Sequence, residues 1–272
     1  MALKSNLFTV AGLAQVREFR LPSGGLPYRE RFPDFPSTVI IQPYSFQTEG
    51  ILVTNLQFLD KLRMVAEKVV TNFPDGFDFR ELLSSDLVTI LTLARALTYG
   101  EKYKFSSTCP ACGTVEKHEL KIPDDLPVRN WNQETMDQVR SETTITLPVC
   151  RDKISLHFMT VEEEKALGES LAGTRKQMSD AALAASGLGN PKLIRTARKI
   201  ATVNETRADT PEEMLEYLKK VQGADMVALL EGIKDAEPGL NFTWDMVCPV
   251  AACATEYKEE MATSMEFFRG FN

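Results

Sequence analysis

Two close pairs of cysteines are the residues best suited to chemistry in this chain. The first pair lies in Cys109-Pro-Ala-Cys112-Gly113, and the second lies in Cys248-Pro-Val-Ala-Ala-Cys253. Thiolates at such short spacing are metal ligands, and a glycine after the pair lets the chain turn back beneath the ion. Each pair supplies two ligands, whereas a tetrahedral zinc ion requires four. The sequence therefore predicts one structural zinc site formed by Cys109, Cys112, Cys248 and Cys253.

The segments around both pairs show the alternating pattern of β-strands. They comprise residues 102–108, 114–122, 241–247 and 255–261. Two hairpins with two cysteines at each tip predict a zinc-ribbon-like β element, built from residues 101–122 and 241–266. Two features depart from the usual ribbon. The linker is far longer than the usual ~15–20 residues, and Ala254 follows the second pair where a glycine is expected.

Other interpretations of the cysteines stay open at this point. Iron in a rubredoxin-like site uses the same four thiolates, so the ligands alone do not distinguish it from zinc. Two unrelated pairs of buried cysteines would also fit, as would a redox dithiol at Cys109, although no thioredoxin-like strand and helix surround that residue. The fifth cysteine, Cys150, is unpaired, and we predict that it is dispensable for metal binding.

Composition limits the class of protein. The chain has 272 residues and a net charge of −7, and no run of lysine and arginine exceeds two residues. Nucleic-acid binding requires neutralisation of phosphates, so this charge argues against a nucleic-acid partner. Five cysteines, four of them in two close pairs, fit a reducing compartment better than a disulfide framework. The sequence shows neither a signal-peptide pattern nor an apolar run of membrane-spanning length, which predicts folding in a cytoplasm.

Apolar periodicity predicts two helices before the first cysteine pair. A long helix is expected over residues 48–72, with one apolar stripe. The stripe consists of Leu52, Leu56, Leu59, Leu62, Val65 and Val69. A second helix is expected over residues 85–98, with Ser85 or Asp86 as its N-cap and Gly100 at its end.

The chain after the first cysteine pair is also predicted to contain strands followed by helices. Strands are expected at residues 143–147 and 153–158. Thr160-Val-Glu-Glu163 is a capping box that opens a helix ending near Met178. Further helices are expected over residues 193–203, 211–222 and 224–236.

The two parts resemble each other and suggest an internal pseudo-repeat. Phe19-Arg-Leu-Pro-Ser and Ile145-Thr-Leu-Pro-Val each precede a loop, a strand, helices and a two-cysteine hairpin. We therefore predict an α+β fold with two strand-plus-helix halves joined by the metal. The predicted units are an N-terminal arm, loop and strand (1–47), the helical part of the first half (48–100), the discontinuous ribbon, the second half (143–240) and a C-terminal tail (267–272).

No arrangement of residues indicates catalysis. The only histidines are His118 and His157, and neither lies near a catalytic partner in sequence. Nucleophile-elbow, phosphate-loop and His-Glu-x-x-His motifs are absent from the sequence. We interpret Trp131 and Trp244 as core or interface anchors. The sequence thus predicts a protein that is not an enzyme.

Several segments, taken in order, resemble a known family. They are Leu21-Pro-Ser-Gly-Gly25, Leu97-Thr-Tyr-Gly-Glu-Lys-Tyr103, the Cys109 to Gly113 hairpin tip, Leu126-Pro-Val128, Leu147-Pro-Val149 and Thr160-Val-Glu-Glu-Glu-Lys165. Together they are similar to the T4-like bacteriophage baseplate hub subunits and hub-assembly proteins of contractile tails. The resemblance covers most of the chain, and the wider second cysteine pair departs from it.

The resemblance implies a structural component of the hub region of a phage tail baseplate. It implies assembly in the bacterial host cytoplasm, residence in the virion, and contacts with hub, tape-measure, tube or wedge proteins. Two alternatives are a non-virion assembly chaperone for hub or tape-measure proteins and, in another class, a zinc-ribbon nucleic-acid adaptor. We further predict binding surfaces outside the ribbon, at residues 1–20 and at the apolar C-terminal residues 265–271.

Overall fold

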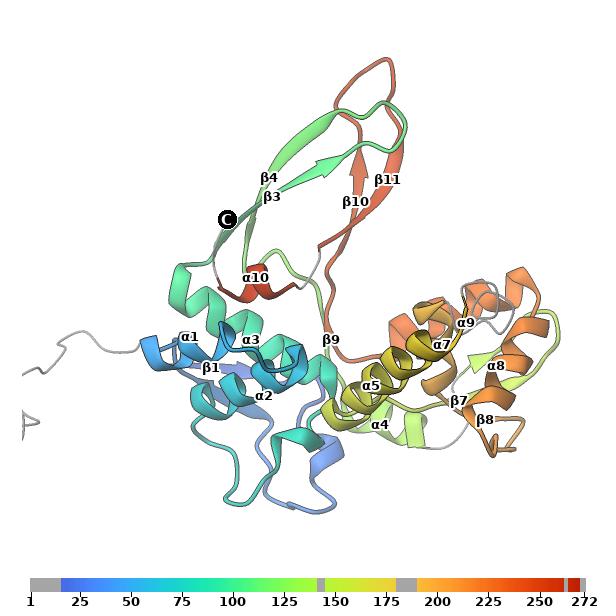
Figure 1. Cartoon of the computed structure of the whole chain (residues 1–272), viewed down its shortest axis with the longest axis horizontal. Helices are drawn as coiled ribbons and strands as arrows, with labels where there is room; N and C mark the ends of the chain where they lie inside the picture. The colour runs from blue at the N-terminus through green and yellow to red at the C-terminus, as the bar shows by residue number, and fades with distance from the viewer. Residues whose placement is uncertain (1–15, 141–144, 180–189, 262–263, 270–272) are drawn as a thin grey trace, which may run out of the picture.

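The chain folds into a helical body from which a long β-ribbon projects (Figure 1). The computed structural model describes residues 16–140, 145–179, 190–261 and 264–269. All sheets in this part are small and antiparallel, with two or three strands each. The α+β class predicted from the sequence is confirmed.

The first half begins with a hairpin, continues through helices and ends in a second hairpin. Its elements are β1 (Arg17–Arg20), η1 (Leu26–Tyr28), β2 (Thr38–Ile41), α1 (Phe46–Leu52), α2 (Phe58–Val69), η2 (Phe79–Glu81), α3 (Ser84–Tyr99), β3 (Lys102–Thr108) and β4 (Val115–Lys121). Strands β1 and β2 pair with Phe19 opposite Val39. The loop between them contains Gly25, where an added Cβ would lie 2.5 Å from the carbonyl oxygen of Pro36.

The second half also runs from a hairpin through helices to a hairpin, with additional elements. After β5 (Val128–Arg129) and α4 (Gln133–Arg140), its elements are β6 (Ile145–Thr146), β7 (Lys153–Leu156), α5 (Val161–Gln177), α7 (Pro191–Arg198), β8 (Ile200–Val203), α8 (Pro211–Lys220), α9 (Gly223–Ala236), β9 (Gly239–Leu240), β10 (Thr243–Val247), β11 (Glu256–Glu260) and α10 (Met265–Arg269). The additional elements are β8, β9 and α10. Strand β7 pairs with both β6 and β8.

Matching contacts support the internal repeat. Leu21 and Leu147 are both fully buried, each just after the first strand of its half. The backbone amide of Thr48 donates to the N-cap Ser45 at the start of α1, and the amide of Glu163 donates to the N-cap Thr160 at the start of α5. The first hairpin and first helix of each half therefore share these contacts, although the sheet of the second half has a third strand, β8.

A buried aspartate is a further repeated feature that the sequence analysis missed. Asp86 and Asp225 are each the third residue of the last helix before the ribbon, and each precedes the first cysteine of its hairpin by the same number of residues. Both are fully buried. Asp86 accepts hydrogen bonds from the amide and hydroxyl of Ser23, whereas Asp225 accepts them from the amides of Val149 and Cys150. Each carboxylate thus holds the Leu-Pro loop of its own half.

The single helix predicted over residues 48–72 is wrong, because the structure has two helices there with a break between them. Residues 53–57 separate α1 from α2, and Leu56 of the predicted stripe is exposed. The hydroxyl of Thr54 donates to the carbonyl oxygen of Ile51 at 2.7 Å, and the amide of Thr54 donates to the same oxygen. A threonine that bonds the backbone locally competes with helix formation.

Two other boundaries differ from the prediction. The helix expected over residues 193–203 ends at Arg198, and residues Ile200–Val203 instead form a strand that pairs with β7. Pairing with a neighbouring strand outweighs the weak helical preference of this segment. The helix expected from residue 85 begins at Ser84, and Asp86 points its carboxylate at the Ser23 loop rather than capping the helix.

The C-terminal helix packs on the chain's own body, which corrects the predicted C-terminal binding surface. Phe267 and Phe268 are buried, and the guanidinium of Arg95 donates to the carbonyl oxygen of Phe267 at 3.0 Å. The Arg95 side chain also lies 4.8 Å from the ring centre of Tyr103. At the other end, residues 17–20 form β1, while residues 1–15 lie outside the described part.

Candidate metal centre

Two hairpins bring the four paired cysteines to one place. Strands β3 and β4 pair from Lys102 opposite Lys121 to Thr108 opposite Val115, and strands β10 and β11 pair from Thr243 opposite Glu260. Their turns lie together at the far end of the ribbon, at the top of Figure 1. The cysteines occupy these turns and so lie far from the body.

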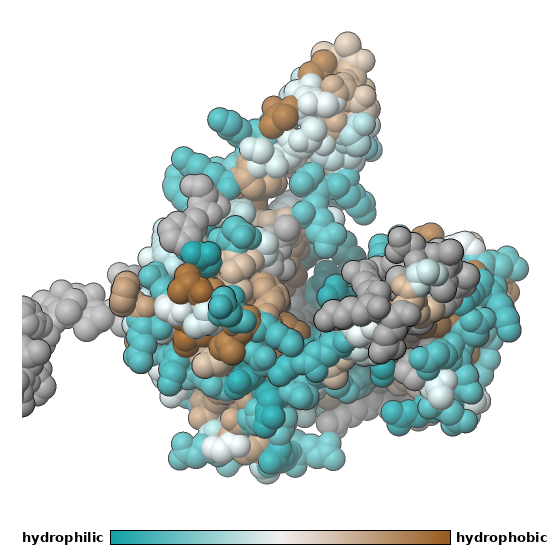
Figure 2. Space-filling model, in the orientation of Figure 1, coloured by the Kyte–Doolittle hydropathy of each residue, from teal (hydrophilic) through white to brown (hydrophobic). Residues whose placement is uncertain are grey.

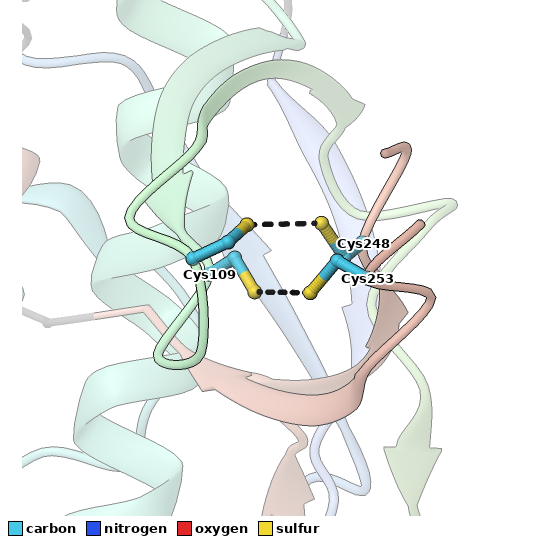
Figure 3. A group of neighbouring side chains, drawn as sticks. Cys109, Cys248 and Cys253 are labelled. Atoms are coloured by element: carbon cyan, nitrogen blue, oxygen red, sulfur yellow. Dashed lines mark hydrogen bonds between the residues drawn. The ribbon is translucent and has the colours of Figure 1, made fainter. Parts of the chain in front are cut away.

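The sulfur atoms form a compact cluster. The four Sγ atoms all lie within 4.8 Å of one another. Across the hairpins, Cys109 Sγ is 3.9 Å from Cys253 Sγ and Cys112 Sγ is 3.5 Å from Cys248 Sγ (Figure 3). Four sulfurs at about 2.3 Å from a tetrahedral zinc ion would lie roughly 3.8 Å apart. The cluster therefore has the dimensions and the ligand type to hold a metal ion.

The two cysteine turns share one closing backbone hydrogen bond. The amide of Cys109 donates to the carbonyl oxygen of Thr114 at 2.9 Å, and the amide of Cys248 donates to that of Thr255 at the same distance. The hydroxyls of these threonines also lie 3.2 Å from the Sγ atoms of Cys112 and Cys253, respectively. The wider spacing of the second pair is thus accommodated without loss of this geometry.

The thiols are electrostatically unequal. The Thr114 hydroxyl lowers the pKa of the Cys112 thiol to about 6. The Thr255 hydroxyl similarly lowers the pKa of Cys253. The Val250 amide lowers the pKa of Cys248, but burial and the neighbouring thiols raise it by more, to about 12. Thiolates this close repel one another, so four of them coexist only with a compensating cation.

Polar and aromatic contacts join the hairpins below the cysteines. Phe105 and Trp244, which precede the first cysteine of each pair by the same number of residues, stack with ring centres 5.7 Å apart. The Ser107 hydroxyl lies 2.8 Å from His118 Nε2 and 2.9 Å from the Tyr257 hydroxyl. The equal spacing of Phe105 and Trp244 from their cysteines was the signal by which the sequence could have shown this pairing.

The histidines lie outside the sulfur cluster, and so does Cys150. His118 bonds Ser107 within the ribbon, and Trp131 is a buried anchor whose Nε1 donates to the carbonyl oxygen of Ala236. His157 Nε2 is 3.0 Å from the carboxylate of Glu163, whose pKa it lowers. Because Glu163 also accepts from the amide of Thr160, this pair belongs to the cap of α5.

Ala254 stands in a conformation that favours glycine. Its φ is 44°, and the equivalent Gly113 has a φ of 73°. The left-handed conformation costs a non-glycine residue about 1–2 kcal/mol, and the extra freedom of glycine in the unfolded chain offsets part of this. We expect Ala254→Gly to stabilise the folded ribbon by roughly 0.5–1 kcal/mol, measured by urea denaturation.

Gly113→Ala is the matched control for this prediction. No heavy atom lies within 4 Å of a Cβ added at Gly113, so the substitution tests backbone conformation alone. It should destabilise the ribbon by a similar amount. A stability loss in Ala254→Gly would show that the left-handed turn is not the source of strain.

The fold and the site define an α+β protein whose two halves meet in a projecting four-cysteine ribbon. Residues 18–269 match the family of T4 bacteriophage base plate proteins, and the chain belongs to this family. Searches of curated proteins and of solved structures gave no match. The predicted resemblance to T4-like baseplate proteins is therefore confirmed, and the chain is a structural protein of the phage tail baseplate that contacts other tail proteins.

Membership also bears on the other predictions. A baseplate structural family suggests a non-enzymatic protein located in the virion tail. In the described residues, we find no helix both long enough and apolar enough to cross a membrane.

Proposed function

We propose that the protein is a subunit of the hub region of the baseplate, and that a structural zinc ion bound by Cys109, Cys112, Cys248 and Cys253 fixes its ribbon. The observation that carries this proposal is the compact sulfur cluster at the tip of an element that projects from the body. A projecting element needs internal support, because few side chains cover it. Zinc would supply that support by joining the two turns.

The ribbon tip is suited to contact another protein. No charged residue occurs in residues 108–115 or 247–255, whereas the strands below them are rich in lysine and glutamate. Val115, Val247 and Val250 are exposed there. An uncharged, apolar tip on a charged stem is the pattern of an interface core with a polar rim. Hub, tape-measure, tube or wedge proteins are the proposed partners.

The metal part of the proposal is tested by elemental analysis of the purified protein. We expect about one zinc ion per chain and thiolate–zinc distances near 2.3 Å by X-ray absorption. Cys150→Ser, which alters the cysteine outside the cluster, should leave the zinc content unchanged. Iron in the native protein would contradict zinc but keep the ligands, and loss of metal in Cys150→Ser would contradict the ligand set.

The location is tested by mass spectrometry of purified virions and of tail assembly intermediates. A hub-region subunit should be present in both, and crosslinks should join it to hub, tape-measure, tube or wedge proteins. Presence in intermediates but absence from virions would instead support the alternative of an assembly chaperone, which acts in the host cytoplasm and leaves.

A further inference from the structure

The two halves contact each other in a head-to-tail manner within the chain. We call residues 158–161 of the second half the α5 corner and residues 82–84 of the first half the α3 edge. The amide of Val161 donates to the carbonyl oxygen of Leu82 at 2.8 Å, and the amide of Ser84 donates to that of Met159 at 3.1 Å. Both surfaces are covered by this contact, with Val161 only 2% exposed.

An ion pair extends the contact between the halves. Lys165 Nζ of α5 lies 3.1 Å from Asp60 Oδ1 of α2. The contact therefore combines strand-like backbone pairing, apolar burial and opposite charges, which are the components of a specific interface.

The internal repeat places an equivalent of the α5 corner in the first half. Ser45 corresponds to Thr160, so residues 43–46 form the equivalent α1 corner. There Phe46, the counterpart of the buried Val161, is 93% exposed. Val53, Leu56 and Phe58, which follow in the segment from the end of α1 to the start of α2, are also exposed, and Figure 2 shows apolar residues gathered over α1 and α2.

The second half carries an equivalent of the α3 edge. Asp225 corresponds to Asp86, so residues 221–223 at the start of α9 form the equivalent α9 edge. Leu83 is buried under the α5 corner, whereas its counterpart Gln222 is exposed, as is Val227 one turn into α9. The chain thus uses one copy of each surface internally and leaves Phe46 and Gln222 of the other copies exposed.

The α1 corner and the α9 edge differ in residue type and lie apart on the body. Helices α1 and α9 lie toward opposite ends of the body in Figure 1. Glu49 follows the α1 corner by three residues and accepts a hydrogen bond from the Tyr99 hydroxyl. Two lysines precede the α9 edge: Lys219 is paired with Glu216, and Lys220 is exposed. Surfaces that differ, lie on opposite ends and are complementary form heterologous contacts, which generate rings or helical filaments.

We propose that copies of this chain associate head to tail, with the α1 corner of one copy bound to the α9 edge of the next, continuing the contact that joins the two halves. The partner for this surface is therefore a second copy of the chain. This association goes beyond the proposed hub function and does not depend on the metal, because neither surface includes the ribbon.

The test measures the mass of the full-length, metal-loaded protein by sedimentation across a range of concentrations. The wild-type mass should rise above that of the 30.4 kDa monomer as concentration increases. Phe46→Asp blocks the α1 corner and Val227→Asp blocks the α9 edge, and each should weaken association at least tenfold. Val128→Asp, which alters an exposed valine outside both surfaces, should associate as the wild type does.

Mixing the two blocked variants distinguishes this contact from others. Phe46→Asp retains its α9 edge and Val227→Asp retains its α1 corner, so the mixture should form a one-to-one complex and nothing larger. Val53→Asp and Lys220→Glu form a second pair if the first variants misfold. A wild type that stays monomeric up to about 100 µM overturns the proposal. Failure of the mixed variants to pair overturns it equally.

Discussion

Replacing Cys109 by serine is expected to release the metal and separate the two hairpins of the ribbon while the helical body stays folded. Cys109 is almost fully buried and lies 3.9 Å from Cys253 across the hairpins. Structural zinc contributes an apparent ~10–16 kcal/mol in small zinc-binding peptides at neutral pH. Without it, the contacts that join the hairpins are chiefly the stacking of Phe105 on Trp244 and the hydrogen bond between Ser107 and Tyr257.

The body has its own sources of stability. Its buried residues form a single cluster that includes Leu87 of α3, Leu156 of β7 and Phe267 of α10. The halves are also joined by the contact between Leu82 and Val161, and the segment between them is held to the second half by the pairing of β5 with β9. The sequence alone predicts that metal loss separates whole halves, but these contacts restrict the expected separation to the ribbon.

Three measurements on Cys109→Ser check this result. Zinc content should fall, far-UV circular dichroism should retain most of its helical signal, and limited proteolysis should gain cleavage sites within residues 102–121 and 243–260. Binding of tail proteins should be lost with the ribbon. Cys150→Ser is the matched control and should behave as the wild type. A metal-free protein whose ribbon resists protease as before would refute the role of the metal, and complete loss of helix would indicate one cooperative unit.

The cysteine site was predictable because its signal is local. Two ligands within each turn, flanked by alternating strands, define both hairpins without knowledge of the rest of the fold. The helix over residues 48–72 failed for the opposite reason. Its apolar stripe continues through Leu56, but the backbone bonding of Thr54 ends α1 and leaves Leu56 exposed.

The repeat was visible in sequence only where residue types were retained. Leu21 and Leu147 are identical and follow similar strands, so the first hairpins could be aligned. The two aspartates were missed because their loop donors differ in kind: the Ser23 hydroxyl and amide in one half, and the Val149 and Cys150 amides with the Cys150 thiol in the other. The head-to-tail contact was not predictable, because it depends on how the halves are oriented in space.

Replacing Asp86 by alanine is expected to have the largest effect on the stability of the body. Its carboxylate accepts from the Ser23 amide at 3.2 Å, the Ser23 hydroxyl at 2.5 Å and the Tyr28 hydroxyl at 2.6 Å. The two hydroxyls in turn accept from the amides of Gly25 and Leu83. The aspartate therefore orients a chain of donors that links the Leu21 loop to the start of α3.

Alanine at position 86 leaves these buried donors without an acceptor. Each buried donor left unsatisfied typically costs about 1–3 kcal/mol, so loss of the acceptor for the Ser23 and Tyr28 groups should cost roughly 3–5 kcal/mol in total. For a chain of this size, each kcal/mol lowers Tm by roughly 2–4 °C, so Asp86→Ala should lower Tm by about 6–20 °C. Chemical and thermal denaturation of the metal-loaded protein measure this, and a Tm within about 2 °C of the wild type would contradict it.

The pH dependence of Asp86 and Asp225 should have opposite signs. Burial raises the pKa of Asp86. At Asp225, burial also acts to raise the pKa. Hydrogen bonds from the Val149 and Cys150 amides lower the pKa by more than burial raises it, so the pKa of Asp225 lies below the ordinary value. A raised carboxyl pKa favours the folded state most at low pH, and this advantage is lost as pH rises through the folded pKa. A lowered pKa favours it above the unfolded pKa, and that advantage is lost as pH falls.

Asp86→Asn and Asp225→Asn, which remove each titration, form a matched pair for this test. As pH falls from about 7 to about 2.5, the wild type should become more stable relative to Asp86→Asn, and below about pH 4.5 it should become less stable relative to Asp225→Asn, as measured by urea midpoints. The pair controls for general acid effects, because both variants share every other titrating group. If the two differences change in the same direction, the loops are held by something other than the ionised or protonated state of these aspartates. If the two stability differences change with pH in opposite directions, each half holds its Leu-Pro loop with a buried aspartate, and the groups around the two carboxylates set the opposite pKa shifts.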